Sequence, residues 1–159
     1  MEAFVPWKGK EIVMESGEGR LKAQVIIDES IPSRLHLVPV FIASAVGKLG
    51  DLQMGEDTVF DLKLCLHEAV VNAIRHGNKE KSELPVHVVI KTENNEMIME
   101  VTDQGKGFDF SRIPDPTTKE NIGKLHGRGV YLIQSAMDGV KFLNGGRTIK
   151  MVKALKTNT

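Results

Sequence analysis

The pattern of apolar and polar positions is clearest at residues 56–76, where it predicts one long helix. Apolar residues recur there every three or four positions, as on a helix that buries one side. That side consists of Leu62, Leu66, Ala69, Val70 and Ala73. The opposite side carries a polar stripe that packing does not require, made of Cys65, Glu68, Asn72 and His76. We expect Gly77-Asn78 to end the helix in a left-handed turn.

Two further elements are predicted before this helix. Alternating apolar and polar residues at 21–28 are typical of a half-buried strand. Helical spacing at 38–49 predicts an amphipathic helix that Gly50 ends. Pro39 fits the first turn of a helix that begins near Val38, because the first amides have no acceptor within the helix. An earlier start at Ser33 would require a kink.

The next part of the chain predicts a hairpin and then a long loop. Runs rich in β-forming residues at 85–92 and 97–102 are joined by Glu93-Asn94-Asn95-Glu96. Asp103 follows the second run directly. Residues 105–129 are too polar and too rich in glycine and proline for continuous regular structure, as is common in a functional lid.

The two ends of the chain carry shorter elements. A helix is expected at 130–137, and then a second hairpin with strands at 140–143 and 148–152 around Asn144-Gly145-Gly146. In the N-terminal extension, the sequence suggests an edge strand at 11–15 and nothing more.

Composition sets broad limits on the kind of protein. The 159 residues suit one domain at 21–153, with the extension at 1–20 and a tail at 154–159. Lysine plus arginine and aspartate plus glutamate each number 21, so no broad field favours nucleic acid or an anionic membrane. The single cysteine excludes an internal disulfide, and we see neither a signal peptide nor an apolar stretch approaching the roughly 20 residues of a bilayer span. We therefore expect a soluble, cytoplasmic protein.

Three short motifs carry candidate chemistry, and each also has a plainer reading. Glu68 and Asn72 lie one helical turn apart, so both can reach one ligand, or they form only a solvated face. Asp103-Gln104-Gly105-Lys106-Gly107 offers a carboxylate to an exocyclic amine such as that of adenine, or it is a tight turn. Gly127-Arg128-Gly129 precedes a helix, where amides suit a phosphate and Arg128 adds charge, or it is a flexible lead-in with an exposed arginine.

Other metal and nucleotide motifs fail on spacing. Val71 stands where the zinc-protease pattern beginning at His67-Glu68 needs its second histidine. The chain has no Walker-type loop, and Gly105-Lys106-Gly107 does not introduce a Rossmann helix directly. The remaining histidines show no ligand spacing; they are His36, His87 and His126.

The order of the three motifs, with strands between them, resembles the N, G1 and G2 boxes of the GHKL (Bergerat-fold) ATPases. Residues 62–76, the lid sequence Pro114-Asp115-Pro116 and residues 127–140 are most similar to the anti-sigma-factor serine kinases of the RsbW and SpoIIAB type. The resemblance covers about residues 21–153. It implies an α/β two-layer sandwich, with helices on one face of a mixed, mainly antiparallel sheet and an ATP lid.

The resemblance also implies a role for each motif residue. Glu68 would act as general base, and Asn72 would coordinate Mg²⁺. Asp103 would accept a hydrogen bond from the adenine amine, while Gly105 and Gly107 would let the backbone approach the base. The other candidate ATP-binding residues are Gly127, Arg128 and Gly129 for the phosphates, Thr148 beside the adenine, and His76 on the polar stripe.

These roles predict a serine/threonine protein kinase that uses ATP and Mg²⁺, phosphorylates a small anti-sigma-factor antagonist and sequesters a sigma factor. A homodimer is expected, although Pro39 lies in the helix that the family uses for dimerisation and partner contacts, and leaves those surfaces unassigned. The alternative is a partner-sequestering module for which ATP is a structural effector without significant kinase activity. Glu68 favours the kinase, because nucleotide sensing alone needs no base. A detached histidine-kinase ATP domain fits less well, since we find no helical hairpin with a phosphoacceptor histidine.

Overall fold

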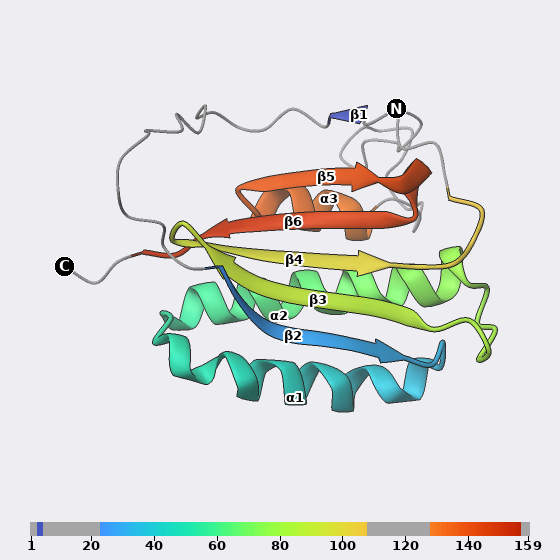
Figure 1. Ribbon diagram of the computed structural model, residues 1–159, viewed down its shortest axis with the longest axis horizontal. Helices are drawn as coiled ribbons and strands as arrows, with labels where there is room; N and C mark the ends of the chain where they lie inside the picture. The colour runs from blue at the N-terminus through green and yellow to red at the C-terminus, as the bar shows by residue number, and fades with distance from the viewer. Residues whose placement is uncertain (1–2, 5–22, 108–127, 157–159) are drawn as a thin grey trace.

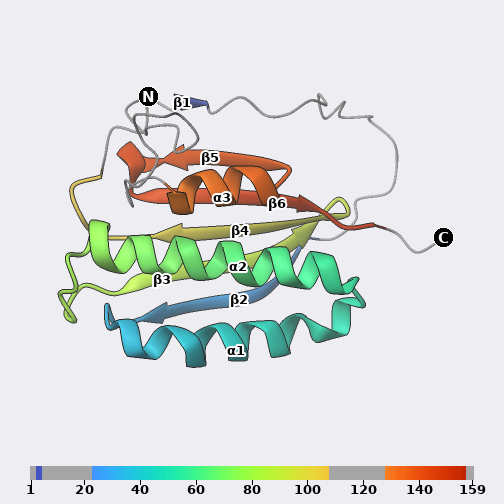
Figure 2. The same cartoon turned by 180° about the vertical axis from the view of Figure 1, so that it is seen from behind.

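One antiparallel sheet carries the described helices on a single face (Figures 1 and 2). The computed structural model describes residues 3–4, 23–107 and 128–156. The strands lie in the order β1-β5-β6-β4-β3-β2, and all the described pairings are antiparallel. This confirms the predicted two-layer sandwich and its mainly antiparallel sheet; among the described strands no parallel pair occurs.

Each strand and helix predicted within the described residues is present close to its expected position. The strands are β1 (Ala3–Phe4), β2 (Gln24–Ile31), β3 (Val86–Glu93), β4 (Glu96–Thr102), β5 (Gly139–Leu143) and β6 (Thr148–Ala154). The helices are α1 (Val38–Leu49), α2 (Glu56–Asn72) and α3 (Arg128–Ala136). Short helical turns are η1 (Leu35–Leu37), η2 (Gly50–Leu52), η3 (Ala73–Gly77) and η5 (Asn144–Gly146).

Both predicted hairpins are confirmed, and left-handed residues close them. Asn94 and Asn95 join β3 to β4 with φ of 51° and 63°, a conformation that asparagine adopts more readily than most residues. Asn144 and Gly145, with φ of 53° and 67°, begin the turn between β5 and β6. Because these turns are only a few residues long, each strand pairs with the next one along the chain.

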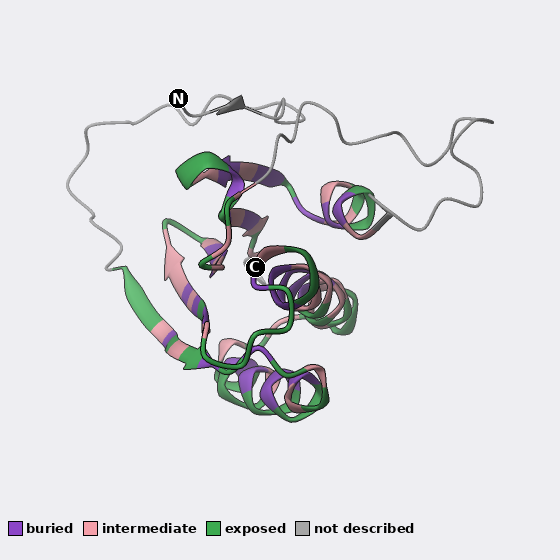
Figure 3. Cartoon of the chain, turned by 90° about the vertical axis from the view of Figure 1, so that its right-hand side faces the viewer, coloured by how far each residue is buried: buried purple, intermediate pink, exposed green. Residues whose placement is uncertain are grey.

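The core lies between the sheet and the three helices, and buried positions line both sides of that interface (Figure 3). Helix α2 packs between α1 and α3 (Figure 2). Its fully buried side chains include Leu66 of α2, Ile90 of β3, Met99 of β4, Met151 of β6 and Ile133 of α3. The apolar side predicted for the long helix is therefore its core side.

Helix α1 begins at Val38 with Pro39 in its first turn, which confirms the simpler of the two predicted starts. Together with η1 and η2 it forms an 18-residue stretch with a mean hydropathy of 1.4, long and apolar enough to cross a membrane. This corrects the expectation that no such stretch exists. Five residues of α1 are buried in the core, and a core helix passes the same test of length and composition.

The N-terminal extension contributes an edge strand that sequence reasoning did not place. Ala3 and Phe4 pair with Phe142 and Lys141 of β5. The strand predicted at 11–15 lies outside the described residues.

Candidate active site

The second half of α2 brings Glu68 and Asn72 against the start of α3. A Cβ atom added to Gly129 would lie 2.6 Å from Glu68 Oε2 and 3.1 Å from Asn72 Nδ2. Only glycine lets the backbone of α3 approach these two side chains so closely. The structure therefore brings together the first motif and the last glycine of the third.

The polar stripe predicted on α2 is confirmed for Glu68 and Asn72, which are partly buried, and for the exposed His76. The Glu68 side chain is 28% exposed, and its Oε1 lies 3.9 Å from His67 Nδ1. The carboxylate thus keeps access to a ligand or a partner.

Cys65 does not belong to the polar stripe, and that part of the prediction is wrong. Its side chain is fully buried in the same cluster as Ile133 of α3 and Met151 of β6. Burial, assisted by the nearby Asp61 charge, raises the pKa of the thiol to about 12. Packing of other elements over this position, which the periodicity of one helix does not show, makes Cys65 an unreactive core residue.

Helix α2 ends in a wide π turn rather than in the predicted left-handed stop. Residues Ala73–Gly77 form the π turn η3, and the Asn78 amide donates to the Ala73 carbonyl at 2.8 Å. Left-handed backbone occurs later, at Lys79 and Glu80. π turns are frequent at functional sites.

The π turn carries Gly77 against the second motif. A Cβ atom on Gly77 would overlap the Asp103 carboxylate, and one on Gly105 would overlap the Gly77 carbonyl. Gly77 is therefore required for close approach, and not for left-handed geometry as expected. These contacts join the end of α2 to the loop that follows β4.

Asp103 lies in a half-buried position at the start of that loop. Its Oδ1 accepts a hydrogen bond from the Gly105 amide at 2.8 Å. Burial raises the pKa of the carboxyl, while the Gly105 hydrogen bond and the Arg147 charge oppose the rise. Gly107 has a left-handed φ of 77°, and a Cβ there would overlap the Gly145 carbonyl. Glycine is thus needed at both motif positions.

Thr148 is joined to Thr102, the residue that precedes Asp103. It pairs in register with Thr102, and the two hydroxyl oxygens are 2.9 Å apart. Asn144 Nδ2 donates to Thr148 Oγ1, also at 2.9 Å, and Thr148 is buried. The start of β6 is therefore rigidly joined to the end of β4.

These groups fit ATP in kind. A half-buried carboxylate suits an adenine amine, and backbone brought close by glycines suits a flat base. An amide beside a helix N-terminus suits a phosphate that carries Mg²⁺. Within the described residues no cluster of three or more histidine, cysteine or acidic side chains could hold a metal ion. Mg²⁺ that accompanies a nucleotide generally takes most of its ligands from phosphates and water.

Some predicted residues lie beyond the described structure. Gly127 and Pro114-Asp115-Pro116 are outside the described residues, and Arg128 is described only as the first residue of α3. Sequence reasoning in turn missed the contacts of Gly77, Asn78 and Arg147. The only signal in the sequence was Gly77-Asn78 as the expected helix end, and nothing pointed to Arg147.

Comparison with known proteins agrees with this geometry. Residues 31–153 match the histidine kinase-like ATPase domain. The chain is 29% identical over 141 residues to the serine-protein kinase RsbW of Staphylococcus epidermidis, covering 84% of this chain and 89% of that protein. RsbW of Staphylococcus aureus (strain bovine RF122) is 29% identical over 138 residues, which cover 82% and 87%. RsbW of Bacillus cereus (strain AH820) is 26% identical over 137 residues, which cover 82% and 85%.

The resemblance seen in the ordered motifs is thereby confirmed. The matched segment runs from before α1 to the next-to-last residue of β6 and includes every motif residue from Glu68 to Thr148. By this match, and by a sandwich that places Gly129 against Glu68 and Asn72 and the Asp103 loop against Gly77, the chain belongs to the histidine kinase-like ATPase domain family.

Proposed function

We propose that the protein is a serine/threonine protein kinase that uses ATP and Mg²⁺, with its kinase domain at 21–153. The observation that carries this proposal is the contact between Gly129 and the Glu68–Asn72 pair. It puts a partly exposed carboxylate next to the helix terminus expected to hold the phosphates. The similarity to proteins named serine-protein kinase supports a serine hydroxyl as the acceptor.

Each group of the site has a task in this reaction. Bound ATP would supply the γ-phosphoryl group to the serine oxygen and leave as ADP when the bond from the γ-phosphorus to the bridging oxygen breaks. Glu68 would accept the proton of the serine hydroxyl, and Asn72 would offer an oxygen to Mg²⁺. Asp103 accepts a hydrogen bond from the adenine amine. Gly127, Arg128 and Gly129 hold phosphates, while Thr148 and His76 border the nucleotide.

The proposed substrate is a small anti-sigma-factor antagonist, and the proposed second partner is a sigma factor that the protein sequesters. Both follow from the resemblance to anti-sigma-factor kinases, and the same resemblance supports a homodimer. This activity belongs in the cytoplasm, where ATP and sigma factors occur together.

The test is phosphoryl transfer from γ-labelled ATP, with Mg²⁺ and a lysate of the host, by the wild type and by Glu68→Gln. We expect a small labelled protein that carries phosphoserine. Loss of a general base should lower the transfer rate by about 10²–10⁴-fold and leave ATP affinity nearly unchanged. Glu56→Gln is the matched control, because Glu56 is an exposed carboxylate in the first turn of the same helix.

Two results would contradict the proposal. Equal rates of transfer by Glu68→Gln and the wild type would show that Glu68 is not the general base. Tight ATP binding without any labelled protein would instead favour a sequestering module in which ATP is only an effector.

A further inference from the structure

We propose that Asn78 is a positioning residue that holds the adenine-binding loop in place. This inference rests on the proposed ATP site, because its consequence is the placement of Asp103. Asn78 is one of the few polar residues buried among the described ones, with 1% of its surface exposed. None of the three motifs includes it.

The Asn78 side chain spans three separate segments. Its Nδ2 donates to Ser33 Oγ at 2.9 Å, to the Leu84 carbonyl at 2.9 Å and to the Pro85 carbonyl at 3.1 Å. Its Oδ1 accepts from the Gln104 amide at 2.7 Å. One amide group thus joins the segment between β2 and α1, the segment before β3 and the loop after β4.

The chemistry of the partners determines which way the amide points. Backbone carbonyls only accept and a backbone N–H only donates, so Nδ2 must face Leu84 and Pro85 while Oδ1 faces Gln104. The buried group therefore uses both its donor and its acceptor side. A side chain without the acceptor side would lose the bond to the partly buried Gln104 amide, and one without the donor side would lose the bonds to the Leu84 and Pro85 carbonyls.

The bond to Gln104 acts directly on the second motif. Gln104 lies between Asp103 and Gly105, and the Gly105 amide binds Asp103 Oδ1. On the other side, the Asp103 amide donates to the Arg147 carbonyl at 2.9 Å. Asn78 adds a side-chain hydrogen bond to the close contacts of Gly77 with this loop, and so helps to set where the carboxylate meets the adenine amine.

The test compares the affinity for ATP with that for purine riboside triphosphate, which lacks the adenine amine. We expect the wild type to prefer ATP by about 10- to 100-fold, the usual range for a hydrogen bond to a charged group. In Asn78→Ala this preference should fall at least several-fold, toward equal binding. A loss of stability alone would weaken the binding of both nucleotides alike and leave the ratio of their affinities unchanged.

Ser33→Ala is the matched control. The Ser33 hydroxyl belongs to the same network and donates to the Leu84 carbonyl at 2.6 Å. Its removal leaves the bond between Asn78 and the Gln104 amide in place. We expect it to lower stability and to keep the ATP preference within about twofold. If Asn78→Ala does not fold, Asn78→Ser replaces it, because the serine hydroxyl ends one bond short of Oδ1 and no longer reaches the Gln104 amide. This variant should lose the preference as well.

The outcomes separate this inference from the proposed function. If the wild type and Asn78→Ala prefer ATP equally, the role of Asn78 is overturned and the proposed function is not. A full preference in Asn78→Ser, or loss of the preference in Ser33→Ala, overturns it as well. A wild type that does not distinguish the two nucleotides overturns the assigned Asp103 contact and this inference with it.

Discussion

At the scale of single residues, Asp103 is a site residue whose ionisation lowers the stability of the folded protein. Folding raises the pKa of this carboxyl, mainly through burial, so the folded protein holds the proton more tightly than the unfolded chain does. Its ionised form therefore lowers stability as the pH rises from the ordinary value of 3.8 through the raised pKa. Ionising this carboxyl in the folded protein therefore costs stability, as expected of a group that serves binding.

Asp103→Asn should separate binding from stability. We expect ATP affinity at neutral pH to fall by about 10- to 100-fold, because the amide presents a donor where the adenine amine needs an acceptor. Stability against urea at neutral pH should stay equal or rise. In the wild type, ATP affinity should fall as the pH decreases through the raised pKa, and calorimetry should find this acid limb absent from the variant. An unchanged affinity, or the same acid limb in both proteins, would contradict the role of Asp103.

At the scale of elements, two glycines with different surroundings test the contact between α2 and α3. Gly129 lies against Glu68 and Asn72, whereas Gly47 is exposed on α1 with nothing within 4 Å of an added Cβ. The same substitution should therefore lower activity at Gly129 and leave it unchanged at Gly47.

Gly129→Ala should slow phosphoryl transfer by about 10- to 100-fold, because the methyl group displaces either the Glu68 carboxylate or the start of α3. Gly47→Ala should leave transfer unchanged and raise the free energy of unfolding by roughly 0.5–1 kcal/mol, since alanine is the better helix former. Kinase assays and urea unfolding measure both effects. Full activity in Gly129→Ala would show that this close approach is not needed.

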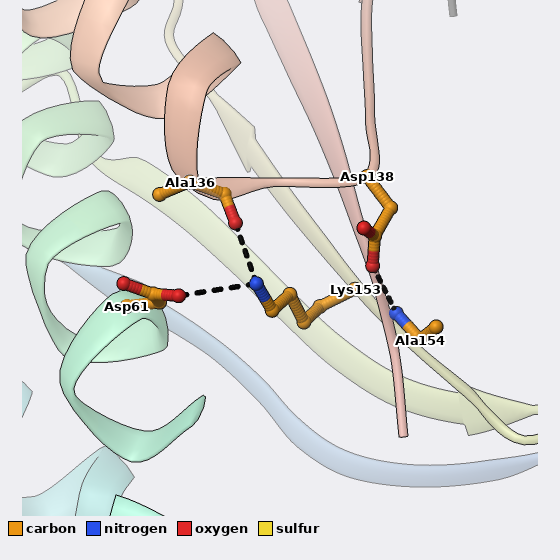
Figure 4. A network of polar contacts seen from close by, with 5 residues as sticks. All are labelled: Asp61, Ala136, Asp138, Lys153 and Ala154. Atoms are coloured by element: carbon orange, nitrogen blue, oxygen red, sulfur yellow. Dashed lines mark hydrogen bonds and ion pairs between the residues drawn. The ribbon is translucent and has the colours of Figure 1, made fainter. Parts of the chain in front are cut away.

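At the scale of the whole molecule, one lysine joins both layers at the end of the α2–α3 pair away from the active site (Figure 4). Lys153 of β6 donates to Asp61 Oδ2 at 3.1 Å and to the Ala136 carbonyl at 2.6 Å. Asp138 Oδ2 nearby accepts from the Ala154 amide at 2.7 Å. A pocket of about 450 Å³ lies here, lined by both helices and by Lys153, and no motif residue that the structure describes lines it.

Asp61→Asn should weaken this connection and leave the chemistry intact. A hydrogen bond to a charged group contributes about 1.5–3 kcal/mol, and the partial exposure of this pair places the expected loss of stability near the lower end. Thermal unfolding measures this loss, with the exposed Asp57→Asn on the same helix as control. Transfer should change by less than about twofold. A large loss of activity without a loss of stability would instead connect this end of the helices to the reaction.

Much of this molecule is determined by local sequence. The apolar periodicity of α2, the two asparagines of the first hairpin and Pro39 at the start of α1 act over a few residues, and the structure has them as predicted. The order of the three motifs was enough to identify the family, because the ligand chemistry requires those residue types at those element ends. Pattern reasoning reaches this far because propensity and spacing are local properties.

The tertiary structure alone decided which surfaces cover one another. Cys65 is a core residue because α3 and β6 pack against α2, and Gly77 must be glycine because Asp103 lies against it. Asn78 acquires its role from partners between 6 and 45 residues away, Ser33, Leu84, Pro85 and Gln104. The edge pairing of β1 with β5 is of the same kind. Such contacts form between segments far apart in sequence, so no local pattern specifies them, and the packed fold supplies the partners.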